Sequence, residues 1–129
     1  MIVGVGVDLV EVKRIQRALE DPKIGLRFRE RVYTQAEISY CEDKGRGKYQ
    51  SYAGRFAAKE AVMKAMGTGW GRRVNWMDIE ILPVPGGKPE LTLRDKTSDF
   101  ARQLGIVRFS LSITHTQQHA MAYVIAEGE

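Results

Sequence analysis

Hydrophobic and polar positions alternate at both ends of the chain. Over residues 1–12, every second position holds a large aliphatic residue, and small or acidic residues stand between them. The aliphatic residues are Val3, Val5, Val7 and Leu9, and the intervening ones are Gly4, Gly6 and Asp8. Residues 107–114 alternate in the same way, and residues 119–126 follow after a polar turn. Because successive side chains of a strand point to opposite faces, these three segments are predicted to be strands.

The middle of the chain follows a helical pattern. Residues 55–66 are rich in strong helix formers, contain no proline and precede Gly67, a common helix-terminating residue. On a helical wheel their apolar side chains cover most of the circumference, which predicts a mostly buried helix. Further helices are predicted over residues 11–20, 34–43 and 94–104. The second of these begins with a capping box formed by Thr34 and Glu37.

These periods predict the fold class. Residues 78–82 and 91–93 flank a turn rich in proline and glycine and are predicted to form a hairpin. Together with the other elements they predict one α+β domain over residues 1–129, in which helices pack against a mainly antiparallel sheet. A chain of 129 residues is long enough for one moderate core and too short for two.

The composition is that of a soluble globular protein, with 43% hydrophobic and 28% charged residues. No apolar run approaches the roughly 20 residues that a membrane-spanning helix needs, so no membrane partner is expected. Cys41 is the single cysteine, which excludes an internal disulfide and fits a reducing compartment. Since the first residues also lack the basic and apolar segments of a secretory signal, a cytoplasmic protein is expected.

The formal net charge of +4 indicates anionic partners. Basic side chains gather over residues 13–31, and Arg14 and Arg17 are predicted to lie on the outer face of the first helix. A small basic α+β domain that holds RNA is one alternative. Against it, the chain has no aromatic-rich RNA-reading motif and no continuous basic stripe, so no nucleic-acid partner is expected.

Charged side chains interrupt the apolar surface of the central helix. Glu60 and Lys64 are four residues apart and therefore lie side by side. They form either a helix-stabilising ion pair or a carboxylate and an ammonium that are presented to a ligand. Asp8 also has two interpretations: it caps the next helix, or it belongs to a site that the neighbouring glycines keep open.

Two glycine-rich loops flank the central helix. Residues 44–48 place Lys44, Arg46 and Lys48 on flexible backbone, which suits either phosphate binding or an ordinary linker. Residues 67–71 contain three glycines and permit backbone N–H groups to turn toward an oxygen-rich ligand. A P-loop is excluded because its glycines open a helix, whereas these close one.

Three segments together resemble the small bacterial holo-acyl-carrier-protein synthases of the 4′-phosphopantetheinyl transferase superfamily. They are Gly4-Val5-Gly6-Val7-Asp8, Phe56-Ala57-Ala58-Lys59-Glu60-Ala61-Val62-Met63-Lys64-Ala65 and Ser112-Ile113-Thr114-His115-Thr116. The Gly87-Lys88-Pro89 turn also matches, and the resemblance covers essentially the whole chain. It implies the 4′-phosphopantetheinyl transferase fold and the Mg²⁺-dependent transfer of 4′-phosphopantetheine from coenzyme A to a serine of apo acyl carrier protein, in fatty acid biosynthesis. Adenosine 3′,5′-bisphosphate would be the second product.

The resemblance also implies roles for individual residues. Asp8 and Glu60 would hold Mg²⁺, and the catalytic residues would be Asp8, Glu60 and Lys64, with Lys64 on the phosphates. Glu60 is the first choice for the general base. Coenzyme A would contact Lys44, Arg46, Arg55, Lys64, Gly67, Thr68, Gly87, Pro89, His115 and Thr116. Two of these assignments stay open, because Arg55 equally suits an ion pair at the helix start and a lone histidine such as His115 is often structural.

Partners follow from the same resemblance. Acyl carrier protein is strongly acidic, and Arg14 and Arg17 would receive it. The family implies a homotrimer with sites between neighbouring chains. The apolar face of the last two strands suits either an internal core, which the sequence alone favours, or a subunit contact, toward which the resemblance tips the balance. This face consists of Val107, Phe109, Leu111, Ile113, Ala120, Ala122 and Val124. A regulatory protein that binds coenzyme A without catalysis is a further alternative.

Overall fold

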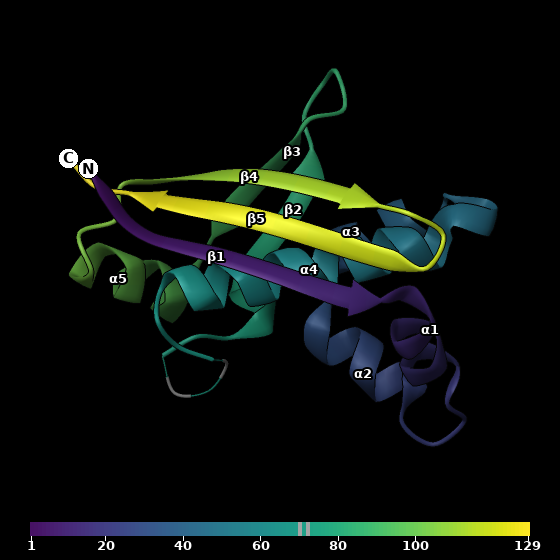
Figure 1. Cartoon of the computed structure of the whole chain (residues 1–129). Coiled ribbons are helices and arrows are strands. Elements are labelled where there is room, and N and C mark those ends of the chain that lie inside the picture. The colour runs from purple at the N-terminus through teal and green to yellow at the C-terminus, as the bar shows by residue number, and fades with distance from the viewer. Residues whose placement is uncertain (70, 72) are drawn as a thin grey trace.

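A three-stranded antiparallel sheet spans the molecule, in the strand order β1-β5-β4 (Figure 1). The computed structural model describes residues 1–69, 71 and 73–129. The sheet consists of β1 (Ile2–Glu11), β4 (Arg108–His115) and β5 (His119–Glu127). The two ends of the chain lie side by side at one end of the sheet, where the Gly128 N–H donates to Met1 O. The predicted α+β class with an antiparallel sheet is confirmed.

The remaining elements pack on one face and one edge of this sheet (Figure 1). A hairpin beyond β4 contains β2 (Ile79–Pro83) and β3 (Pro89–Leu93). The helices are α1 (Val12–Glu20), α2 (Gly25–Val32), α3 (Gln35–Glu42), α4 (Lys48–Ala65) and α5 (Asp95–Gln103). Two short 3₁₀ helices are η1 (Gly45–Gly47) and η2 (Trp76–Asp78). In the part of the chain that the structure describes, no helix is both long and apolar enough to span a membrane.

Two helices differ from the prediction. The central helix α4 begins at Lys48, well before residue 55, because Tyr52 already packs into the core. The short helix α2 was not predicted. Its only buried residues are Gly25 and Val32 at its two ends, so it carries almost no apolar periodicity.

Helix α4 lies directly against the first strand because two positions of β1 have no side chain. A Cβ atom on Gly6 would lie 1.9 Å from the carbonyl oxygen of Ala61, and one on Gly4 would lie 1.9 Å from that of Ala65. Such distances are impossible for a real Cβ atom, so only glycine permits this contact. The glycines therefore admit a neighbouring backbone, and the close packing brings Asp8 beside α4.

The two faces of the sheet differ in what covers them. Small residues of β5 face α4 and are buried, namely Ala120, Ala122, Val124 and Ala126. The part of the predicted face that β5 contributes is therefore internal core. The subunit contact that the resemblance favoured is wrong for these residues, because α4 already covers them. The opposite face is apolar yet exposed: its residues on β1 (Val3, Val5, Val7 and Leu9) are between 41% and 62% exposed. Met121 and Tyr123 of β5 extend this exposed apolar face.

Candidate functional site

Asp8, Glu60 and Lys64 meet where α4 passes β1. Lys64 Nζ lies 3.1 Å from Asp8 Oδ1 and 3.1 Å from the carbonyl oxygen of Val7. Among the described residues, Lys64 on α4 forms its ion pair with Asp8 on β1. It does not pair with Glu60, although their spacing along the helix would allow it. Asp8 does not cap the next helix, since the N-cap of α1 is Glu11. The structure thus favours the site interpretation for both Asp8 and Lys64.

The electrostatics of Glu60 reflect this crowding. Partial burial raises the pKa of Glu60, and the nearby charge of Asp8 raises it further, while Lys64 and Arg14 act in the opposite direction. Two neighbouring carboxylates repel each other and therefore attract a divalent cation. The described residues contain no group of three or more His, Cys, Asp or Glu that could hold a metal. Two carboxylates suit Mg²⁺ nonetheless, because Mg²⁺ takes water and phosphate oxygens for its other ligands.

A separate cavity of about 320 Å³ gathers the basic residues Lys44, Arg55 and His115. The Arg55 side chain is only 7% exposed, stacks on the Tyr40 ring at 4.2 Å and donates to the Ser51 hydroxyl at 3.2 Å. Its Nε is buried without a hydrogen-bond partner. A buried donor without a partner is costly, so this guanidinium is poised for an anionic ligand. Neither contact is acidic, which disfavours the alternative of an ion pair at the helix start.

The other predicted coenzyme A contacts are spread over several parts of the chain. Arg46 lies in η1 beside the basic cavity, and the Thr116 hydroxyl accepts from the His119 N–H and so closes the β4–β5 turn. Gly67 and Thr68 directly follow α4, within a turn of Lys64, and the Thr68 N–H donates to Met63 O. Gly87 belongs to the β2–β3 turn, whereas Pro89 is the first residue of β3 and lines a cavity of about 240 Å³ with residues of β4. Within the glycine-rich loop, Trp70 lies outside the described residues.

One chain does not bring the two groups together. Arg55 and Lys64 are separated by about two and a half helical turns, so their side chains leave α4 on opposite sides. Asp8 lies on β1 and His115 on β4, and β5 stands between these strands. Strands that both flank a third lie roughly 10 Å apart. The carboxylates and the basic cavity are therefore two half-sites on either side of α4.

The two predicted docking arginines lie on α1 in different surroundings. The Arg14 guanidinium stands 5.7 Å from the centre of the Phe56 ring and lowers the pKa of Glu60, so it faces the carboxylates. Arg17 is exposed in the last turn of the helix. The structure thus places one arginine at the carboxylate half-site and one beyond it.

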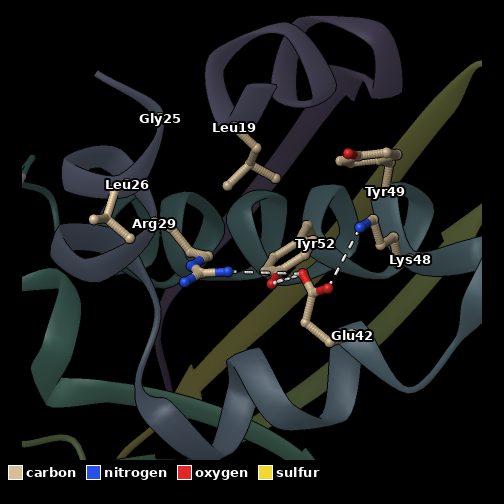
Figure 2. Close-up of a pocket in the computed structure, with 8 residues that line it drawn as sticks. All are labelled: Leu19, Gly25, Leu26, Arg29, Glu42, Lys48, Tyr49 and Tyr52. Carbon is tan, nitrogen blue, oxygen red and sulfur yellow. Dashed lines mark hydrogen bonds and ion pairs between the residues drawn. The ribbon is translucent and has the colours of Figure 1, made fainter. Parts of the chain in front are cut away.

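Figure 2 shows a cavity of about 260 Å³ at the other end of α1. Leu19, Leu26 and Tyr49 form its apolar walls. At its floor the Glu42 carboxylate accepts from the Tyr52 hydroxyl at 2.6 Å, and this bond lowers the pKa of Glu42. Lys48 of the basic loop lines this cavity, and its ammonium pairs with Glu42 at 3.4 Å.

A buried charge pair beneath the site was missed from the sequence. Lys59 and Glu37 are fully buried and form an ion pair of 2.7 Å. The position of Lys59 on an otherwise apolar part of the central helix was the available signal, since lysine is almost never fully buried without a partner.

Comparisons with known proteins find relatives over nearly the whole chain. The family model described as 4′-phosphopantetheinyl transferase superfamily matches residues 4–124. The chain is 51% identical over 127 residues to holo-[acyl-carrier-protein] synthase of Solibacter usitatus, covering 98% of this chain and 99% of the relative. It is 48% identical over 120 residues to the protein of that name from Ruminiclostridium cellulolyticum, covering 93% and 88%.

Solved structures show the same likeness. The crystal structure of holo-[acyl-carrier-protein] synthase from Neisseria meningitidis matches with a TM-score of 0.88 at 38% identity, covering 98% of this chain and 99% of that one. The structure of a Bacillus anthracis holo-(acyl-carrier-protein) synthase in complex with CoA (3′,5′-ADP) matches with a TM-score of 0.82 at 37% identity, covering 100% and 99%. The chain belongs to the 4′-phosphopantetheinyl transferase superfamily.

Proposed function

We infer that residues 1–129 act as one holo-acyl-carrier-protein synthase domain, which transfers 4′-phosphopantetheine from coenzyme A to a serine of apo acyl carrier protein. The observation that carries this proposal is the meeting of Asp8, Glu60 and Lys64, together with a basic cavity on the same helix. The relatives that bear this name cover nearly the whole chain, which supports the same activity. We place the reaction in cytoplasmic fatty acid biosynthesis.

The reaction exchanges one phosphorus–oxygen bond for another. The serine oxygen bonds to the β-phosphorus of coenzyme A, and the bond from that phosphorus to the bridging oxygen breaks. The bridging oxygen leaves with the α-phosphate as adenosine 3′,5′-bisphosphate. The serine proton would go to Glu60 as the general base.

Asp8 and Glu60 would hold Mg²⁺, which supplies neutralisation of the charge on the pyrophosphate oxygens when it is bound. The Lys64 ammonium, exposed beside Asp8, would contact the same oxygens and stabilise the charge that develops on them. Arg55, with its unpartnered Nε, would receive the 3′-phosphate together with Lys44 and His115. Arg46 and Thr116 flank this cavity, and Gly67, Thr68, Gly87 and Pro89 would line the remaining length of coenzyme A.

Mass spectrometry tests the activity. Apo acyl carrier protein, incubated with this protein, coenzyme A and Mg²⁺, is expected to gain the mass of one phosphopantetheine group. Omission of Mg²⁺ is the control. Tight binding of coenzyme A without any adduct would instead support the regulatory alternative.

A homotrimer would unite the two half-sites. The exposed apolar face on β1 and β5 supports association, because exposed contiguous apolar surface marks interaction sites. In such a trimer, the carboxylates of one chain would meet the basic cavity of the next. This face lies opposite the one that the sequence pattern suggested for a subunit contact.

Subunit exchange tests the shared site. Asp8→Ala and His115→Ala proteins are each expected to be impaired, and a mixture after exchange is expected to regain activity, since some interfaces then carry both intact half-sites. Light scattering should give three times the chain mass. A monomer, or no recovery despite verified exchange, would contradict a shared site.

Charge reversal at Arg17 tests carrier docking. Arg17→Glu is expected to raise the KM for the acidic carrier about tenfold and to reduce its salt dependence, because surface charges mainly steer association. The KM for coenzyme A should change less than twofold. Arg14→Glu should also raise the carrier KM, but its closeness to Glu60 makes Arg17 the cleaner variant. Equal losses for both substrates would refute a dedicated docking helix.

A further inference from the structure

A polar cluster inside the core lies directly beside the carboxylate half-site. Lys59 precedes Glu60 on α4, and its side chain is fully buried. Its Nζ donates to Val32 O at 2.6 Å, to Glu37 Oε1 at 2.7 Å and to Trp76 O at 3.1 Å. An ammonium has three N–H donors, so every donor of Lys59 is used.

The carboxylate of Glu37 is equally occupied. Its Oε1 also accepts from the Thr34 N–H at 2.9 Å, which is the predicted capping contact. Its Oε2 accepts from the Ile81 N–H at 2.8 Å, so the residue does more than cap α3. Lys59 and Glu37, here called the buried pair, therefore tie α4 to the end of α2, to α3, to η2 and to β2.

Stability alone does not explain the buried pair. Burial lowers the pKa of Lys59, while Glu37 acts in the opposite direction. Removing two charges from water costs about as much as their attraction returns, and well-packed apolar residues often serve stability better. What an ion pair adds is direction, because each hydrogen bond fixes one atom in distance and angle.

On the opposite side of α4, hydrogen bonds to β1 come from Lys64, whose exposed ammonium donates to Asp8 Oδ1 and to Val7 O. A long, exposed side chain of this kind holds the helix less firmly than the buried pair does. There the helix meets β1 through the backbone at Gly4 and Gly6 and the carbonyl oxygens of Ala61 and Ala65. This contact brings the backbones of helix and strand close together. A smooth contact of this kind resists separation more than it resists rotation of the helix about its axis. Such a rotation would swing Glu60 away from Asp8.

We propose that Lys59 and Glu37 are positioning residues: the buried pair fixes the rotation of α4 and so holds Glu60 opposite Asp8 for a divalent cation. This rests on the proposed function, in which those two carboxylates hold the metal. Neither residue of the buried pair touches the substrate. Loss of the buried pair should lower metal affinity by displacing Glu60, and it should leave the basic cavity unchanged.

Metal binding is the decisive measurement. Lys59→Met keeps the length of the side chain and removes its charge. Mn²⁺ binding in the presence of coenzyme A, followed by electron paramagnetic resonance, is expected to weaken at least tenfold. The Mg²⁺ concentration for half-maximal transfer should rise by a similar factor, whereas the KM for coenzyme A at saturating Mg²⁺ should change less than twofold. The double variant Lys59→Met/Glu37→Gln leaves no unpaired buried charge, so it can be used if the single variant does not fold. Its Mn²⁺ binding should weaken by the same factor.

A matched control separates positioning from general destabilisation. Ile79→Ala removes a fully buried side chain on β2 and leaves the buried pair in place. It is expected to lower the melting temperature while keeping Mn²⁺ affinity within twofold of wild type. If a folded variant of the buried pair binds Mn²⁺ as wild type does, or if Ile79→Ala weakens binding equally, the positioning role is refuted. Absence of Mn²⁺ binding by the wild type would instead show that the carboxylate half-site holds no metal, and the positioning role would be refuted with it.

Discussion

Asp8→Ala and Glu60→Ala are each expected to lower kcat by about 10²–10³-fold or more, the loss typical of removing a group that stabilises developing charge. Asp8 and Glu60 are the two carboxylates that come together at the crossing of β1 and α4, so either change leaves Mg²⁺ with a single protein ligand. Transfer rates measured over a range of Mg²⁺ concentrations check this. The defect should be largest at limiting Mg²⁺.

The replacement of each carboxylate by its amide is the control for this prediction. Asp8→Asn retains an oxygen that accepts from Lys64 Nζ and is expected to preserve the melting temperature, yet it removes the charge that a cation needs. Its rate should therefore fall close to that of Asp8→Ala. A near-normal rate of either alanine variant at limiting Mg²⁺ would show that the residue is not a ligand.

Gly6→Ala is expected to destabilise the fold by about 3 kcal/mol, at the upper end of the usual cost of overpacking, because the new Cβ atom meets backbone that cannot rotate away. That atom would lie 1.9 Å from the carbonyl oxygen of Ala61. Relief of the clash requires β1 and α4 to move apart, which also separates Asp8 from Glu60. A fall in both melting temperature and kcat is therefore expected.

Gly47→Ala provides the comparison, because the nearest atom to its added Cβ is a flexible Gln50 side-chain oxygen at 3.8 Å. Chemical denaturation should show a change of less than about 1 kcal/mol for this variant, since no backbone blocks the new atom. Equal stability of Gly6→Ala and the wild type would contradict the close packing of α4 on β1.

The strands and the central helix could be predicted because side-chain periodicity reports local geometry without any knowledge of partners. The same periodicity cannot say which face is covered. Val5 and Val124 look alike in the sequence, yet Val124 is buried under α4 while Val5 is 46% exposed. The placement of β5 between β1 and β4 also could not be read from the pattern, since pairing joins residues that lie more than a hundred positions apart, as Asp8 and Ala122 do.

The candidate site was only partly predictable for a similar reason. Asp8 and Glu60 each stood out by local context, and only the family resemblance joined them. Two features of the site could be understood only from the structure. The glycines of β1 were interpreted as clearing space for a ligand, but they make room for the backbone of α4. The role of Lys59 could not be predicted from the sequence, because its three acceptors come from α2, α3 and η2.

The central place of β5 in the sheet has a consequence for protein synthesis. A ribosome makes β1 first and β4 much later, and these two strands cannot pair with each other because β5 separates them. Until β5 leaves the exit tunnel, β1 has no strand neighbour and Asp8 has no fixed position against α4. A nascent chain without β5 is therefore expected to bind no metal, and the site should arise only when β5 joins the sheet.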